Sequence, residues 1–218
     1  MGRRRGVFIS FEGGEGCGKS TQIRRLIEHM KASGQEVLLT REPGGTAVGE
    51  QLRHVLQHSR EAENMVPETE LLLFAASRAQ LVREVIAPAL QANKLVISDR
   101  FLDSTTVYQG VARQISESAV AKINHFAVGT CLPDTTFLLD LDLKISQQRM
   151  SNRENPKNNY DRMEAQPPDF HEAVRQGYLK LAAKEPARFV VLDAKQEEEK
   201  IFTQLLGVLK KRHDGLFN

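Results

Sequence analysis

The chain has 218 residues, of which 40% are hydrophobic and 27% are charged, and its formal net charge is +2. These values are ordinary for a globular protein with one well-buried domain, and the small charge argues against a dominant nucleic-acid surface. Two cysteines, Cys17 and Cys131, are too few for a disulfide framework and lack metal-ligand spacing. The basic start is not followed by an apolar run long enough for a signal peptide or a membrane span. We therefore expect a cytoplasmic protein with reduced thiols.

Short apolar segments alternate with helical patterns along the whole chain. The expected strands are 7–12, 36–40, 95–99, 135–142 and 189–193, and the expected helices are 20–32, 48–57, 68–86, 116–128, 144–153, 169–185 and 196–212. Pro88 is expected to end or kink the helix before it. Continuous apolar strands between helices indicate a five-stranded parallel sheet covered on both faces. We expect a single doubly wound α/β domain over residues 1–218.

The loop after the first expected strand fits the pattern G-x-x-x-x-G-K-[ST] over residues 13–20. Glycines let successive backbone N–H groups point at an anion, and the N-terminus of the following helix adds partial positive charge. Lys19 is expected to reach the β- and γ-phosphates, and Ser20 to place its hydroxyl on Mg²⁺. A glycine-rich turn capped by Ser20 is the alternative, but the strand–helix context favours a nucleoside triphosphate site. The residues expected to contact this nucleotide are Gly13, Gly14, Glu15, Gly16, Cys17, Gly18, Lys19, Ser20 and Thr21.

A P-loop alone does not identify the reaction, because switches, motors and small-molecule kinases share it. The further segments "TREPGGT" (40–46), "LLLFAASRAQ" (71–80) and "DRFLDSTTVYQG" (99–110) follow expected strands or lie on the helix between them. Open α/β sheets place their ligands there. Together with "FEGGEGCGKST", "LDLDLKISQQR" and "LDAKQ", these segments resemble the thymidylate kinase family. The resemblance implies a nucleoside monophosphate kinase fold, ATP-dependent phosphorylation of dTMP to dTDP for dTTP synthesis, Mg²⁺ as cofactor, and a homodimer.

The resemblance also implies an acceptor site for dTMP. Phe74 is expected to stack on thymine, and Arg78, four residues later on the same helix face, to donate to a thymine carbonyl. Taken singly, a core phenylalanine and a solvated arginine are the alternatives. Arg100 is expected to hold the monophosphate, which suits the guanidinium geometry. The full set implied for dTMP is Glu15, Glu42, Pro43, Arg53, Phe74, Arg78, Arg100, Ser104, Thr105, Tyr108 and Gln109.

Within that set, Thr105 is expected beside the 5-methyl group, Gln109 near the pyrimidine and Tyr108 over the deoxyribose. Arg53 is either a second phosphate contact or a solvated helix residue. Glu15 is expected at the 3′-OH.

The resemblance implies a magnesium site at Ser20, Asp99 and Glu15. Asp99 either accepts a hydrogen bond from a metal-bound water or orients neighbouring donors. The catalytic set implied is Lys19, Arg153, Asp99 and Glu15.

Some members of the family carry an arginine in the P-loop where this chain has Gly16, and others supply the positive charge from a mobile lid. The polar segment 150–166 is expected to form that lid, with Arg153 reaching the phosphates and Arg162 as a second phosphate contact; Lys157 lies between them. A solvated charged loop is the alternative. For the adenine of ATP, the resemblance implies packing by Arg149 and backbone contacts from Asp193, Ala194 and Lys195.

Several other functions remain as alternatives. The nearest is a nucleotide kinase with a different base preference. A GTPase switch needs N-K-x-D after a late strand, but Asn93 and Lys94 are followed by Leu95 and Val96. A motor ATPase or an inactive homologue is the third alternative. No basic face or motif indicates a nucleic-acid partner, and no segment indicates a membrane.

Overall fold

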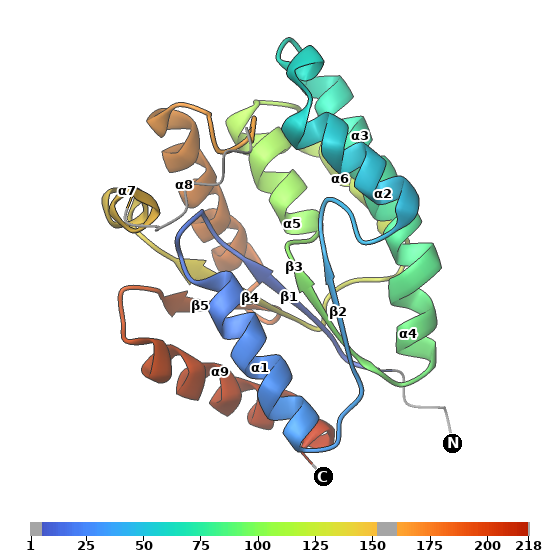
Figure 1. Ribbon diagram of the computed structural model, residues 1–218, viewed down its shortest axis with the longest axis vertical. Coiled ribbons are helices and arrows are strands. Elements are labelled where there is room, and N and C mark those ends of the chain that lie inside the picture. The colour runs from blue at the N-terminus through green and yellow to red at the C-terminus, as the bar shows by residue number, and fades with distance from the viewer. Residues whose placement is uncertain (1–5, 152–160, 218) are drawn as a thin grey trace.

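The computed structural model describes residues 6–151 and 161–217. At its centre is a sheet of five parallel strands in the order β2-β3-β1-β4-β5 (Figure 1). The strands are β1 (Phe8–Glu12), β2 (Val37–Arg41), β3 (Leu95–Asp99), β4 (Thr135–Asp140) and β5 (Phe189–Asp193). The expected fold class is confirmed, and the expected third and fifth strands agree with β3 and β5 residue for residue.

Helices cover both faces of this sheet, and the side chains of β1 explain why. Ile9 and Phe11 pack toward α1 and α9, whereas Phe8 points to the opposite face, as the alternation of a strand requires. In Figure 1, α1 and α9 lie on one face and α3, α5, α6 and α8 on the other. The helices are α1 (Lys19–Ala32), α2 (Ala47–Arg53), α3 (Pro67–Leu81), α4 (Ala87–Gln91), α5 (Leu102–Thr105), α6 (Glu117–Val128), α7 (Leu143–Ser151), α8 (Pro168–Lys184) and α9 (Glu198–Arg212). Among the described residues, no helix combines the length and hydropathy that crossing a bilayer requires.

Every strand of the sheet ends on a charged residue. These residues are Glu12, Arg41, Asp99, Asp140 and Asp193. Because the strands are parallel and in close register, the five side chains lie along one edge of the sheet. That edge is where an open α/β sheet binds its ligands.

The helix expected over 68–86 does not end at Pro88. After α3 the chain makes a π-helical turn, η3 (Val82–Ile86), and continues as α4 through Pro88. Proline has no N–H to donate to the preceding turn, and a widened turn accommodates that loss without breaking the helix. A similar turn, η1 (His54–His58), extends α2.

The segment after β3 is helical, which the sequence patterns did not predict. Helix α5 runs directly into the π-helical turn η4 (Thr106–Ala112). Ser104, Thr105, Tyr108 and Gln109 therefore lie on successive turns of one helical segment and face the same side. This helix presents a row of polar side chains from a single rigid element.

An ion pair ties α5 to the sheet beside β5. Arg188 donates from Nη1 and Nη2 to the two carboxylate oxygens of Asp103, at 2.6 and 2.9 Å, and from Nη1 to Thr136 Oγ1 at 2.8 Å. Asp103 is only 1% exposed, so the pair forms a buried bridge.

Arg188→Ala is expected to lower the free energy of unfolding by about 3 kcal/mol, because it leaves the Asp103 carboxylate buried without its cation. Urea denaturation measures the loss. Lys184→Ala is the matched control, since Lys184 pairs with Glu117 in solvent and its removal should change stability by less than about 1 kcal/mol. Equal effects of the two substitutions would show that the buried bridge does not stabilise the fold.

Candidate active site

The glycine-rich loop joins β1 to α1 at the charged edge of the sheet. Gly13 has φ of 138° and Gly18, immediately before α1, has φ of 93°. Glycine adopts these left-handed conformations without the steric cost of a Cβ. At Gly13 a Cβ would also lie 2.5 Å from the carbonyl oxygen of Leu139. The loop therefore depends on glycine at both positions for its backbone angles, and at Gly13 also for its close contact with β4.

The Lys19 side chain folds back onto the glycine-rich loop and bonds to its backbone. Its Nζ donates to the carbonyl oxygens of Gly13 and Gly14, at 3.1 and 3.0 Å, and its side chain is largely buried. These two contacts hold the ammonium group at the mouth of the loop, where the N-terminus of α1 also favours negative charge.

The charges around Lys19 keep it ionised. Burial and Arg100 act to lower its pKa, but Cys17, Glu15 and Asp99 outweigh them, and the pKa of Lys19 is raised. The ammonium group is consequently charged at neutral pH and ready to exchange its carbonyl partners for an anion.

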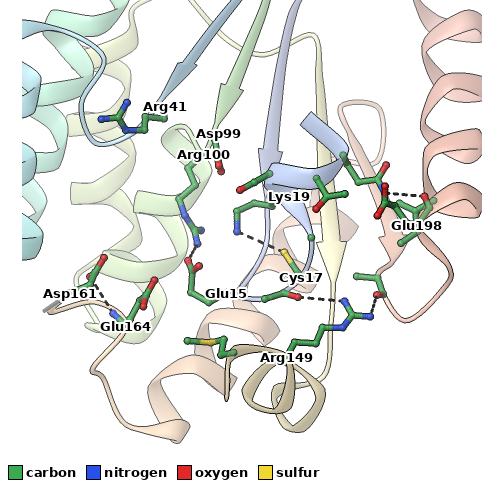
Figure 2. A pocket seen from close by; sticks show the side chains of 18 of the residues that line it. Glu15, Cys17, Lys19, Arg41, Asp99, Arg100, Arg149, Asp161, Glu164 and Glu198 are labelled. Carbon is green, nitrogen blue, oxygen red and sulfur yellow. Dashed lines mark hydrogen bonds and ion pairs between the residues drawn. The ribbon is translucent and has the colours of Figure 1, made fainter. Parts of the chain in front are cut away.

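A cavity of about 940 Å³ opens beside the loop (Figure 2). Arg149 of α7 spans one end of it, donating to Ala194 O at 3.0 Å and Gly16 O at 3.4 Å, and both contacts are drawn in Figure 2. The expected ATP contacts that line this cavity are Glu15, Gly16, Cys17, Gly18, Lys19, Ser20, Thr21, Arg149, Ala194 and Lys195.

Three other expected ATP contacts do not line this cavity. Gly13 and Gly14 line an adjoining cavity between the loop and β4. Asp193 accepts a hydrogen bond from the backbone N–H of Lys195 at 3.0 Å, so its carboxylate shapes the loop that follows β5.

Arg100 occupies an unusual backbone conformation directly after β3. Its φ is 69°, which costs a non-glycine residue of order 1–3 kcal/mol and persists only where the surroundings hold it. Here the Arg100 N–H donates to Phe11 O at 2.9 Å, and Ser98 Oγ donates to Arg100 O at 2.6 Å. The side chain thereby reaches the glycine-rich loop, where Nη2 lies 2.5 Å from Glu15 Oε1 (Figure 2). The guanidinium also lies 5.4 Å from the Tyr108 ring centroid.

A third and narrower cavity, of about 50 Å³, also borders Arg100. Glu15 and Arg100 belong to the walls of both this smaller cavity and the larger cavity of about 940 Å³. All the expected dTMP contacts except Arg53 line the smaller one: Glu15, Glu42, Pro43, Phe74, Arg78, Arg100, Ser104, Thr105, Tyr108 and Gln109. Arg53 lines the larger cavity instead and donates to Pro43 O at 2.9 Å.

Arg78 is not a solvated helix residue, because its side chain is 1% exposed. It donates from Nε to Glu42 Oε2 at 2.7 Å, from Nη1 to Asn124 Oδ1 at 2.9 Å and from Nη2 to Thr105 Oγ1 at 2.9 Å. These contacts fix the guanidinium in the wall of the smaller cavity and connect three separate elements there.

Glu12, the last residue of β1, belongs to the same region and was not predicted. Its Oε1 accepts from the Phe101 N–H at 2.8 Å, and its Oε2 accepts from Tyr178 and Ser104 hydroxyls, both at 2.7 Å. Burial, reinforced by the charge of Asp103, raises the pKa of Glu12 to about 7. The only signal in the sequence was a carboxylate at the end of an apolar strand.

The lid expected over 150–166 is described only at its two ends. Arg153 and Lys157, including the arginine expected to reach the phosphates, lie outside the described residues. Arg162 is described, and its expected phosphate contact is wrong: Nη2 lies 2.6 Å from Glu70 Oε2 and Nε donates to Leu56 O at 3.1 Å. Arg162 is buried and lines neither the larger nor the smaller cavity.

A parallel sheet of this order, a P-loop at its charged edge and two cavities that share an arginine define a P-loop nucleotide kinase. A family model described as thymidylate kinase matches residues 11–205. The chain belongs to the thymidylate kinase family.

Individual members of the family match this chain over nearly its full length. The thymidylate kinase of Kosmotoga olearia is 45% identical over 214 residues, which cover 96% of this chain and 100% of that protein. The thymidylate kinase of Geobacter sulfurreducens is 45% identical over 209 residues, covering 95% and 98%. A crystal structure of thymidylate kinase from Ehrlichia chaffeensis is 33% identical and superposes with a TM-score of 0.75, covering 94% of this chain and 99% of that one. The expected family and the expected enzyme class are confirmed, which excludes the switch and motor alternatives.

Proposed function

We propose that ATP binds in the larger cavity, that dTMP places its base in the smaller one and its phosphate at Arg100 between the two, and that the γ-phosphoryl group passes in line to yield dTDP for dTTP synthesis. One observation carries this arrangement: Arg100 and Glu15 lie in the walls of both cavities, so two phosphate groups can meet there. The reaction needs positioning and charge stabilisation rather than covalent catalysis. The acceptor phosphate is already anionic near neutral pH, so no strong general base is required.

On the donor side, the backbone N–H groups of the P-loop hold the phosphates of ATP, and Lys19 exchanges its carbonyl partners for the β- and γ-phosphate oxygens. Arg149 packs against the adenine. The contact of Arg149 with Ala194 supports this role, because it connects the P-loop end of the cavity with the loop that offers backbone groups to the base.

On the acceptor side, Arg100 binds the phosphate of dTMP, with its planar guanidinium suited to two parallel hydrogen bonds. Phe74 stacks on thymine and Arg78 donates to a thymine carbonyl. Thr105 lies beside the 5-methyl group, and Tyr108 covers the deoxyribose. The shared helical face of α5 and η4 supports the roles of Thr105 and Tyr108. Ser104, Glu42, Pro43 and Gln109 complete the pocket, and Arg53 is a second phosphate contact from the larger cavity.

Magnesium fits the donor cavity. Ser20, Asp99 and Glu15 line it and offer a hydroxyl and two carboxylates, the hard oxygen ligands that Mg²⁺ prefers. Within residues 6–151 and 161–217, no cluster of three or more His, Cys, Asp or Glu side chains forms a complete metal cage. That agrees with an ion held by one or two protein oxygens together with nucleotide phosphates and water. When bound, Mg²⁺ would neutralise charge on the transferred phosphoryl group.

Phe74→Ala is expected to raise the KM for dTMP about tenfold and to leave kcat within about threefold, because the ring contributes stacking to both ground and transition states. Steady-state kinetics with varied dTMP measures the two parameters. Lys211→Ala, at an exposed site of α9 outside both cavities, is the control and should change neither. An unchanged KM in Phe74→Ala would contradict the placement of the base.

Arg153→Ala is expected to lower kcat about a hundredfold while dTMP binding stays nearly the same, because it removes a positive charge needed mainly in the transition state. Single-turnover kinetics and calorimetric dTMP binding separate the two effects. Normal turnover in this variant would show that the lid does not supply the catalytic charge through Arg153.

We also propose that the chain is one domain, works in the cytoplasm and forms a homodimer. All five strands belong to one sheet, which supports a single domain. Leu72 of α3 and Phe126 of α6 are 56% and 79% exposed, and these neighbouring helices offer an apolar surface for a second copy. Sedimentation velocity tests the dimer.

A further inference from the structure

The amide of Gln109, in the wall of the smaller cavity, is oriented by a buried carboxylate behind it. Gln109 donates from Nε2 to Glu70 Oε1 at 2.7 Å. Glu70 lies on α3 and is fully buried. It precedes Phe74 by four residues and Arg78 by eight, so all three side chains follow one face of the helix.

Glu70 faces two guanidinium groups, and its carboxylate oxygens act as acceptors toward both. Arg162 Nη2 lies 2.6 Å from Glu70 Oε2, and Arg113 donates from Nε and Nη2 at 3.3 and 3.2 Å. A guanidinium group only donates hydrogen bonds, so the Glu70 oxygens that contact it accept. The half of the Gln109 amide that faces Glu70 must therefore be its NH₂ group.

The carbonyl oxygen of Gln109 remains available to accept a hydrogen bond from a ligand in the smaller cavity. Among the described residues no donor bonds to Gln109 Oε1, and this oxygen is not one of the fully buried atoms without a partner. Since Gln109 lines the smaller cavity together with Phe74 and Arg78, the cavity presents an acceptor from Gln109 and a donor from Arg78.

An acceptor from Gln109 beside a donor from Arg78 matches the hydrogen-bonding edge of a pyrimidine that carries O4 and N3–H. Thymine and uracil carry a carbonyl acceptor at position 4 beside an N3–H donor, whereas cytosine carries an amino donor beside an N3 lone pair. We infer that Glu70 is a positioning residue for base specificity: it turns the Gln109 carbonyl toward N3, so that an N3–H is accepted and the N3 lone pair of cytosine is repelled. This inference rests on the proposed binding of dTMP in the smaller cavity.

Glu70→Gln tests the inference, because a neutral amide can donate as well as accept and so allows Gln109 to turn. The ratio of kcat/KM for dCMP to that for dTMP is expected to rise by at least about tenfold. The ratio for dUMP to dTMP should stay the same, because uracil and thymine share the edge that Gln109 contacts. Calorimetric dissociation constants for the three monophosphates without ATP should follow the same pattern.

Arg113→Gln is the matched control. It removes one partner of the same carboxylate but leaves Glu70 paired with Arg162, and Arg113 lines neither the larger nor the smaller cavity. Its dCMP to dTMP ratio should equal that of the unchanged protein. If Glu70→Gln fails to fold because two arginines lose their countercharge, the double variant Glu70→Gln/Arg113→Gln removes one positive charge along with the negative one.

Three results would overturn the inference: an unchanged dCMP ratio in a folded Glu70 variant, an equal rise in Arg113→Gln, or a rise for dUMP as large as that for dCMP. The last two would show general loosening of the pocket instead of a turned amide. Absence of dTMP turnover in the unchanged protein is a separate result, which would overturn the proposed function and this inference with it.

Discussion

Lys19→Met is expected to lower kcat by about three orders of magnitude, as removal of a preorganised charge at the transferred phosphoryl group does. Methionine matches the length of the lysine stem but has no charge and no N–H donor. The substitution removes the contacts of Nζ with Gly13 O and Gly14 O and the cation at the N-terminus of α1. An assay of ADP release at saturating ATP and dTMP measures the change.

The control for this prediction lies on the same helix. Lys31 is exposed in the last turn of α1, far from the P-loop. Lys31→Met should leave kcat within about twofold, because surface charges at that distance are screened. Retention of more than about a tenth of kcat by Lys19→Met would contradict the role of Lys19 in charge stabilisation.

Arg100→Ala is expected to lower kcat/KM for dTMP by about three orders of magnitude, because it removes the charged partner of the acceptor phosphate in a partly buried site. Arg100→Lys should recover only part of that loss, since an ammonium group cannot make the two parallel hydrogen bonds of a guanidinium. Steady-state kinetics and calorimetric dTMP binding measure both variants.

Because the Arg100 backbone is left-handed, a glycine variant separates loss of the guanidinium from backbone strain. Glycine adopts φ near 69° freely, so Arg100→Gly removes the guanidinium without the backbone strain that alanine retains. Arg100→Gly should be as inactive as Arg100→Ala but more stable to heat. If Arg100→Lys had the KM of the unchanged protein, a point charge would suffice and the bidentate arrangement would be wrong.

The parts of the fold that could be predicted are those that local sequence encodes. The strands are uninterrupted apolar runs, and the P-loop is a fixed spacing of glycines before Lys19 and Ser20. Segment η4 was missed because "STTVYQG" is rich in β-branched residues and ends in glycine, which disfavour helix; packing against α8 and α6 overrides that preference. Pro88 does not end the helix, because a π-helical turn before it absorbs its missing N–H.

Two buried acidic residues of the site, Glu12 and Glu70, could not be predicted. Glu12 ends an apolar strand and meets Tyr178, 166 residues further along the chain. Glu70 lies among leucines in an apolar helix, and its partners Gln109, Arg113 and Arg162 come from distant segments. Nothing in the local pattern separates such residues from ordinary surface carboxylates, since their roles arise only where the elements meet. For the same reason Arg162 was assigned to the phosphates although it turns toward Glu70.

The most direct test of the central claim is ADP release from Mg·ATP with dTMP, dUMP, dCMP, dGMP, AMP or thymidine as acceptor, and with none. We expect strong turnover with dTMP, weaker turnover with dUMP and negligible turnover with the others. Preferred turnover of another monophosphate would leave the P-loop assignment intact but contradict the reading of the base by Phe74 and Arg78. Loss of ATP without any acceptor would contradict the claim that two substrates meet at Arg100.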